Sequence, residues 1–239
     1  MESTSASYQL PGGYRQGVFD PVITFELFAQ DTSSERPATA RAGTSVTTDP
    51  TGLAVGDFVA VVQDVGASQV AAVGQITSVG AGTITLDALA GGAPVIDGTN
   101  DVVYLLEGTG ADMGELTSSG VTTALVGFNV STDVDGGYVV QVFEDDDLRT
   151  ADEAIADVTD GNVTAGAEEY GARSSDTTLT DSTFDTADTA FTANPQEVAS
   201  ESGTRFEDRH FVTLKAAISE ETPDGAYGQT LSFIVSGNF

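Results

Sequence analysis

The sequence predicts an all-β fold, a sandwich of two sheets with a smaller β-unit inserted into it. Apolar and polar residues alternate over several stretches, these stretches are rich in Val, Ile and Thr, and glycine-rich turns separate them. With 239 residues, of which 40% are hydrophobic, the chain is long enough to bury a sizeable core.

Strands of the sandwich are predicted on both sides of the inserted unit. Residues 18–28 and 121–131 each alternate between apolar and polar side chains. Residues 132–137 are rich in turn formers and lead into a third strand at 138–143, so the sequence predicts a hairpin between the last two.

The C-terminal part repeats the alternating pattern. Residues 212–218 and 227–235 predict two more strands, and the last one is expected to direct Leu231 and Phe233 into the core. Residues 150–153 match a capping box, which predicts a helical turn or two through residue 156. Residues 172–208 are rich in Ser, Thr and Asp and predict long loops with one or two short strands.

Residues 40–108 differ in composition from their flanks. They are rich in Gly, Ala and Val, and their aromatic residues are Phe58 and Tyr104. Several short strands in so short a stretch favour a small β-barrel, placed at an exposed loop where insertions are tolerated. The chain is therefore predicted to divide into residues 1–39 with 109–239, which form the sandwich, and residues 40–108, which form the barrel. The barrel strands are expected at residues 57–62, 69–79, 83–86 and 102–106.

The charge balance indicates adaptation to very high salt. The chain has 37 Asp and Glu against 8 Lys and Arg, a net charge of −29. In dilute buffer such a surface repels itself, whereas at 1 M salt the screening length falls to about 3 Å. The carboxylates are scattered, apart from a run at residues 144–147, which argues against a cation buffer or a nucleic-acid mimic. Direct nucleic-acid binding is disfavoured because it needs clustered cations.

The sequence predicts no enzyme and no cofactor. Cysteine is absent, which excludes disulfides and thiolate metal sites, and His210 is the one histidine, expected to pack in a strand. Neither a G-x-S-x-G elbow nor a phosphate-binding glycine loop occurs. Pairs of carboxylates do not indicate a glycosidase here, because some pairing is expected by chance in a chain with 37 acids.

Three weaker candidates remain for sites. Asp133 and Asp135 in the predicted hairpin loop, and the acidic run 144–147, offer oxygen ligands to a hard cation, with solvated loop acids as the alternative. Asn162 begins an Asn-Val-Thr glycosylation pattern in a predicted turn, whereas a second match at Asn129 lies inside a predicted strand.

A single eight-stranded jelly roll has two sheets joined by long connections, and residues 1–39 with 109–239 are a suitable length for it. With its inserted unit at residues 40–108, its acidity and its C-terminal strand, the chain resembles the larger, turret-bearing major capsid protein of halophilic icosahedral viruses with an internal membrane, the sphaerolipovirus group. The resemblance rests on this architecture and covers the whole chain in outline. It implies upright jelly rolls packed side by side in a shell, with copies of the chain and a second small capsid protein as partners.

Residues 1–16 show no basic region, apolar region or twin arginine typical of export signals. This favours a virion protein assembled in the host cytoplasm over the main alternative, a secreted jelly-roll matrix or fibre protein of a halophilic microbe, which residues 128–140 and 166–171 also resemble. A tail or head-decoration protein of a tailed halophilic virus is a third possibility, to which the barrel is suited. In a capsid, residues 1–16 are expected to clasp a neighbour, to face the internal membrane, or to form a flexible tail.

Overall fold

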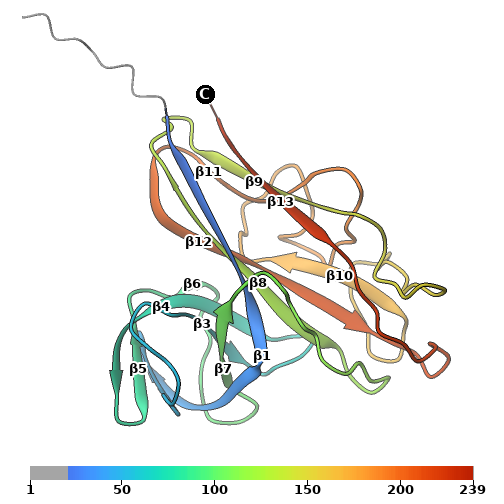
Figure 1. The fold of residues 1–239 in the computed structure, drawn as a ribbon, viewed down its shortest axis with the longest axis horizontal. Helices are drawn as coiled ribbons and strands as arrows, with labels where there is room; N and C mark the ends of the chain where they lie inside the picture. The colour runs from blue at the N-terminus through green and yellow to red at the C-terminus, as the bar shows by residue number, and fades with distance from the viewer. Residues whose placement is uncertain (1–20, 239) are drawn as a thin grey trace, which may run out of the picture.

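The computed structural model describes residues 21–238, and the predicted N-terminal arm and the first residues of the strand predicted at 18–28 lie outside this range. The described chain contains thirteen strands in two antiparallel sheets and no helix, which confirms the predicted all-β, jelly-roll-like class (Figure 1). The strands are β1 Ile23–Ala42, β2 Ser45–Thr48, β3 Phe58–Gln63, β4 Val70–Gly80, β5 Thr83–Leu86, β6 Ala90–Gly91, β7 Val102–Glu107, β8 Thr122–Thr132, β9 Tyr138–Glu144, β10 Glu169–Ser174, β11 Gln196–Glu201, β12 Arg205–Ala217 and β13 Leu231–Gly237.

The sandwich has a four-stranded layer and a three-stranded layer. The first runs β10–β12–β8–β1 and uses the N-terminal half of β1, and the second runs β11–β9–β13 (Figure 1). Alternate residues of β8 and β9 meet between the layers, and the core there includes Phe128, Val130, Tyr138 and Val140. Hydrophobic burial of this face is what brings the two layers together.

The predicted hairpin at residues 121–143 is wrong. β8 pairs with β1 and β12, whereas β9 pairs with β11 and β13 in the other layer. The turn residues between them therefore carry the chain across the core instead of back along the same sheet. The reason is burial: both strands present an apolar face, and facing each other across the core buries both faces.

The predicted helix at residues 150–156 is also wrong. Thr150 Oγ1 does accept hydrogen bonds from the backbone N–H of Asp152 and Glu153, at 3.2 and 3.0 Å, as a capping residue would. The chain then turns back, because the Thr150 N–H donates to the Glu153 carbonyl at 2.7 Å and Arg149 pairs with Ala154 as a β-bridge. The turn places Ile155 fully inside the sandwich core.

The long loops contribute to the core. Phe184 and Phe191 lie in the segment between β10 and β11 and are fully buried, with ring centroids 5.5 Å apart. This part of the chain was expected to consist of loops with one or two short strands, and one strand, β11, is found within it.

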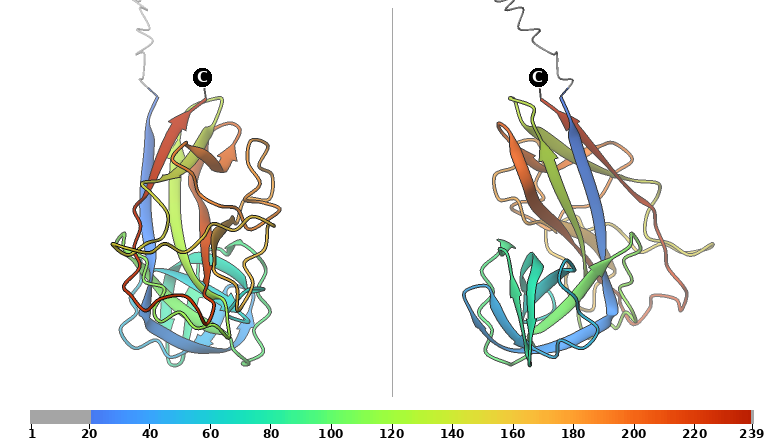
Figure 2. Two further views of the ribbon diagram at one scale, coloured as in Figure 1. Left: turned by 90° about the vertical axis from the view of Figure 1, so that its right-hand side faces the viewer. Right: turned by 60° about the vertical axis from the view of Figure 1, so that its left-hand side comes forward.

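A small barrel closes at one end of the sandwich. Its strands follow the ring β1–β2–β5–β4–β3–β7, and β7 pairs with β1 to complete it. Val46, Val59, Ile76 and Ile84 fill its interior. The predicted division at residues 39 and 40 stays a prediction. β1 runs unbroken through that position, from the sandwich layer into the barrel wall (Figure 2).

A separate apolar layer joins the barrel to the sandwich. Phe28, Leu125 and Phe211 come from the outer face of the four-stranded layer and pack with residues of β3, β4 and β7. Two ionic side chains of β12 add polar contacts, because Arg209 pairs with Asp87 at 2.6 Å and Lys215 donates to the Ala67 carbonyl at 3.0 Å. The barrel and the sandwich are therefore held as one block.

Candidate functional site

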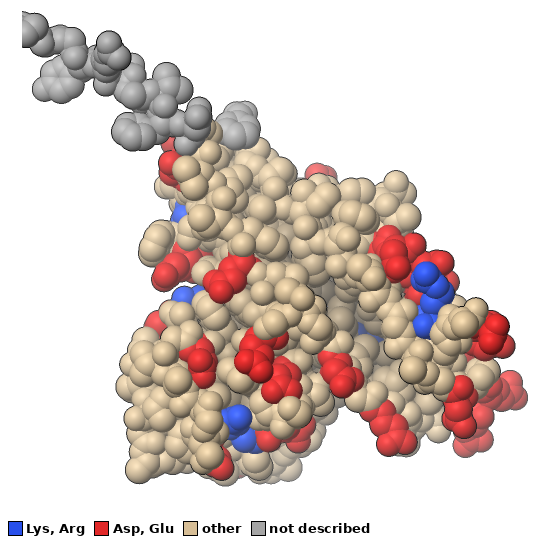
Figure 3. Space-filling model, viewed as in Figure 1, with Lys and Arg blue, Asp and Glu red and all other residues tan. Residues whose placement is uncertain are grey.

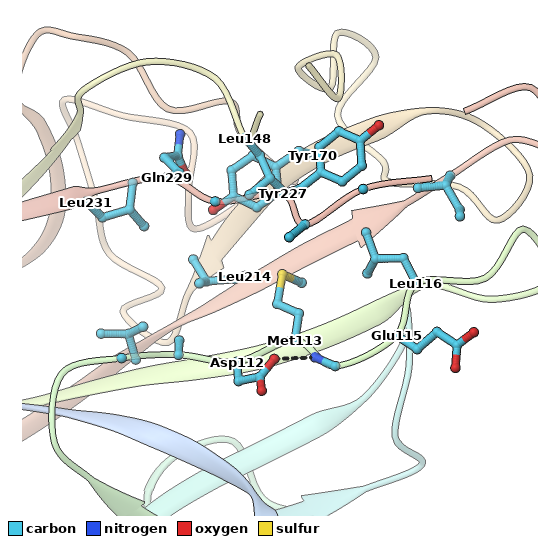
Figure 4. A pocket seen from close by; sticks show the side chains of 18 of the residues that line it. Asp112, Met113, Glu115, Leu116, Leu148, Tyr170, Leu214, Tyr227, Gln229 and Leu231 are labelled. Atoms are coloured by element: carbon cyan, nitrogen blue, oxygen red, sulfur yellow. Dashed lines mark hydrogen bonds between the residues drawn. The ribbon is translucent and has the colours of Figure 1, made fainter. Parts of the chain in front are cut away.

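A cleft of about 600 Å³ opens along one side of the sandwich. Its volume lies within the range of small-molecule pockets. Residues 109–116 and 222–229 form its two lips, and Leu27, Leu214 and Phe233 line its floor. Met113 extends into the cleft, whereas Glu115 points away from it (Figure 4). The cleft thus combines an apolar floor with polar and acidic residues at its margin.

Two polar groups of this cleft are engaged within its own lips. The N–H of Gly114 donates to the carboxylate of Asp112 at 2.8 Å, which shapes the lip itself (Figure 4). The Tyr227 hydroxyl donates to the Pro223 carbonyl at 2.8 Å, so it is also engaged within its own lip. An arrangement of this kind offers apolar contact area.

A first group of acids lies beside the cleft. Oxygen atoms of Glu144, Asp147 and Asp157 lie within 4.8 Å of one another. Glu144 ends β9 and faces inward, in phase with Tyr138, Val140 and Val142 along the strand. Asp157 is positioned by its neighbour Val158, whose N–H donates to the Tyr170 carbonyl at 2.8 Å.

Burial and mutual repulsion dominate the electrostatics of this group. Glu144 is 7% exposed, and burial, followed by the charges of Asp157 and Asp147, raises its pKa to about 7. Burial and then Asp147 raise the pKa of Asp157 as well. The pKa of Tyr170 is raised by burial and by the same two carboxylates, Glu144 and Asp157.

A second group of possible ligands, two acids and a histidine, lies at the other end of the sandwich and has a cation beside it. It consists of Glu201, Asp208 and His210. Arg205 contacts the carboxylate of Glu201 and lies 3.5 Å from that of Asp208. Tyr138 donates its hydroxyl to Asp208 at 3.1 Å, and burial together with that carboxylate raises the pKa of the tyrosine. The guanidinium therefore offsets part of the negative charge of this group.

Asp133, Asp135 and Asn162 belong to neither group, whereas His210 is a member of the second. Asp133 and Asp135 are exposed at the turn between β8 and β9, and Asp133 accepts a hydrogen bond from the N–H of Val22 at 2.7 Å. Asn162 is exposed in a loop, and its glycosylation stays a prediction. His210 lies in β12 with its ring 6.0 Å from that of Phe128.

Sequence reasoning missed how the acidic run is divided. Asp145 and Asp146 turn towards Arg149, whereas Glu144 and Asp147 turn towards Asp157. The period of two along β9 is a signal that would have placed Glu144 on the inner face. Nothing in the local sequence indicates Asp157, because a contact with the distant Tyr170 positions it.

None of the described residues forms a helix long and apolar enough to cross a lipid bilayer. Comparison of the chain with protein-family models, with curated proteins and with solved structures finds no match.

Proposed function

We propose that this chain is a structural protein that forms a shell in very high salt, as the major capsid protein of a halophilic icosahedral virus. The observation that carries the proposal is the rigid two-part block. One continuous strand, β1, belongs to both the sandwich and the barrel, and a buried apolar layer fixes the angle between them. Subunits that pack sidewall to sidewall need a fixed shape of this kind, because a hinge between the two parts would prevent identical contacts throughout the lattice.

The acidic surface supports the proposal that the protein functions in very high salt. Acidic side chains are spread over both the barrel and the sandwich, with few Lys or Arg among them (Figure 3). Among residues 21–238, seven carboxylates lie within 4.0 Å of a cation: Asp87, Asp145, Asp146, Asp188, Glu201, Glu207 and Asp208. Most of the 37 acids therefore rely on salt to screen their repulsion.

An exposed apolar patch at the end of the sandwich far from the barrel supports contact between subunits. Phe206 is 81% exposed and lies beside Val22, which is 57% exposed. A β-bulge between Arg205 and Asp208, with Glu207 at φ of 51°, lifts Phe206 out of the strand. Strained backbone that exposes a large aromatic side chain suits a contact with a partner.

Electron microscopy of the purified chain at rising protein concentration, in molar salt, tests the proposal. Closed shells or sheet-like lattices are the expected products. Linear fibres would favour an envelope fibre protein, and tubes would favour a tail protein. A monomer that persists at every concentration, alone and with a second small jelly-roll protein from the same genome, would contradict a shell function.

A pair of surface variants sharpens this test. Phe206→Ser should reduce lattice formation and leave the melting temperature unchanged, because the ring contributes little to the folded monomer. The control is Val95→Ser, at a position that is 66% exposed on the barrel end. If both variants assemble as the parent does, the patch around Phe206 is not a subunit contact.

A further inference from the structure

The acids Glu144, Asp147 and Asp157 form a group with no cation of its own. Within residues 21–238, no Lys, Arg or His lies within 4.0 Å of any of these three carboxylates. The nearest arginine in sequence, Arg149, pairs with Asp145 at 3.8 Å and Asp146 at 3.3 Å. The group at Glu201 and Asp208, by contrast, holds Arg205. One acidic group therefore has a cation beside it, and the other is unbalanced.

Buried oxygen atoms at the unbalanced group also lack donors, which is independent of the clustering. Oδ1 of Asp157 is inaccessible to solvent and has no hydrogen-bond partner, and the same holds for Oε1 of the adjacent Gln229. Glu144 is more than nine-tenths buried. Of its two carboxylate oxygens, only Oε2 accepts a hydrogen bond from a described residue, the Gln229 amide at 2.5 Å. Buried oxygens without donors are costly and are usually satisfied by a proton, a water or a metal ion.

The backbone holds these oxygens in place. Glu144 is fixed by the ladder of β9 and by its N–H, which donates to the Thr192 carbonyl at 3.0 Å. Asp157 pairs with Tyr170 as a β-bridge, and Tyr170 is itself in β10. The ligands thus come from two stretches of chain, residues 144–147 and the segment around Asp157, which a bound ion would tie together.

We propose that Glu144, Asp147 and Asp157 bind a divalent cation of the calcium class between the two layers of the sandwich. The ligands are all hard oxygens, which Ca²⁺ prefers. Two oxygens bound to one Ca²⁺ at about 2.4 Å can be at most about 4.8 Å apart, and the three carboxylate oxygens meet this limit. Three carboxylates favour a divalent ion over the monovalent ions of brine. The Gln229 amide donates a hydrogen bond to Glu144 and so orients this ligand.

Calcium titration of the full chain tests this site. The protein is first freed of metal by a chelator in molar NaCl and then titrated with CaCl₂ by calorimetry. Tb³⁺ emission excited through tyrosine gives a second readout, since Tyr170 adjoins the site and the chain has no Trp. The parent should bind one Ca²⁺ per chain, melt at a higher temperature when loaded, and release Tb³⁺ to Ca²⁺ more readily than to Mg²⁺, which needs a tighter shell.

Three variants decide the assignment. Glu144→Gln and Asp157→Asn should each weaken Ca²⁺ binding by about tenfold or more, because each removes a charged ligand. Asp146→Asn is the matched control from the same acidic run and should bind as the parent does, since Asp146 pairs with Arg149. In chelator, Glu144→Gln should melt no lower than the parent, because it relieves repulsion among the three acids.

The proposal is overturned if the parent shows no saturable Ca²⁺ binding, which would mean that a shared proton satisfies the group. It is also overturned if Asp146→Asn loses as much affinity as the other two variants, since binding would then be diffuse. Mg²⁺ displacing Tb³⁺ as readily as Ca²⁺ would remove the assignment to the calcium class.

Discussion

Gly127 shows how closely the barrel approaches the sandwich. It lies in β8 opposite Phe28 of β1 on one side and Phe211 of β12 on the other. A Cβ at this position would lie 2.2 Å from Cε2 of Phe28, so the aromatic ring occupies the space above the glycine. That ring stacks in turn on Phe58 of the barrel, with centroids 4.5 Å apart. The absence of a side chain at Gly127 is therefore what lets the two parts meet.

Gly127→Ala should destabilise the protein by about 1–3 kcal/mol, because the added methyl group must push Phe28 off Phe58. Thermal melts in molar salt measure the effect. Gly110→Ala is the control, since a Cβ there would meet nothing within 4 Å. Equal melting temperatures for the two variants would mean that the junction is loosely packed.

The ion pair of Asp87 and Arg209 crosses the same junction. Burial tends to raise the pKa of Asp87, but hydrogen bonds from the Gln75 N–H, from Arg209 and from the Ala88 N–H outweigh it, so the pKa lies below its usual range. Arg209 is 6% exposed and also lies over the ring of Phe58 at 5.2 Å. Losing the carboxylate would leave a buried guanidinium without its closest partner.

Asp87→Asn should cost about 1–3 kcal/mol at neutral pH, since Glu207 at 3.8 Å keeps part of the balance. The folded pKa of Asp87 is depressed, so its contribution is complete above the unfolded value of about 3.9 and is lost as pH falls through the folded value. The gap in stability between parent and variant should therefore be constant at neutral pH and narrow in acid. Glu107→Gln, which removes the same charge from an exposed position, should show no such gap. A stability difference between parent and Asp87→Asn that widens in acid would contradict a lowered pKa of Asp87 in the folded protein.

At the scale of elements, alternation in the sequence predicted the strands well and their partners poorly. Alternation along β8 puts Phe128 and Val130 on one face, and both lie in the sandwich core. Leu125 lies on the opposite face of β8 and is buried too, because the barrel covers that face. The predictions of a hairpin between β8 and β9 and of a helix at Thr150 are wrong for the same reason. Burial of apolar faces that are distant in the sequence outweighs the local turn and capping signals.

The candidate site shows the same limit. The acidic run 144–147 was visible as a source of oxygen ligands, and the period of β9 would have turned Glu144 inward. Within the run, the two middle acids lie near Arg149 and the two outer acids lie near Asp157. The contact with Asp157 depends on the tertiary fold. No local pattern carries that information.

β13 is the element whose predicted face can be tested directly. Leu231, Phe233 and Val235 pack against the sandwich core, as expected, but they are half-buried because β13 is an edge strand beside the cleft. Phe233→Ala should cost about 2–3 kcal/mol, less than the ~3–5 kcal/mol of a fully buried ring. Ile234→Ala, on the opposite face and 44% exposed, should cost below about 1 kcal/mol. Similar losses in urea titrations would mean that the register of β13 is different.

At the scale of the whole molecule, the charge of −29 sets the conditions for folding. Lowering salt from molar to ~0.1 M lengthens the screening distance from about 3 Å to about 10 Å, so that neighbouring carboxylates repel each other. The melting temperature should fall steadily over this range, and light scattering should show loss of assemblies. A melting temperature that is independent of salt would contradict adaptation to brine.

Removal of the barrel tests whether the sandwich folds by itself. Gln30 can be joined to Gly108 by a short Gly-Ser linker, because the N–H of Ala29 already donates to the Gly108 carbonyl at 3.1 Å. The excision keeps every strand of both sandwich layers but uncovers Phe28, Leu125 and Phe211. Exposing each of these side chains costs roughly 1.5–3 kcal/mol, and together they form a contiguous apolar patch.

The excised protein should therefore aggregate, and the same protein with Phe28, Leu125 and Phe211 all changed to Thr should stay soluble with a strand-type circular dichroism spectrum. Threonine suits an exposed strand position and removes the apolar patch. Solubility of the excised protein without these changes would mean that the junction contributes little. Unfolding of both proteins would mean that sandwich and barrel are one cooperative unit, in which β1 must be complete before either part is stable.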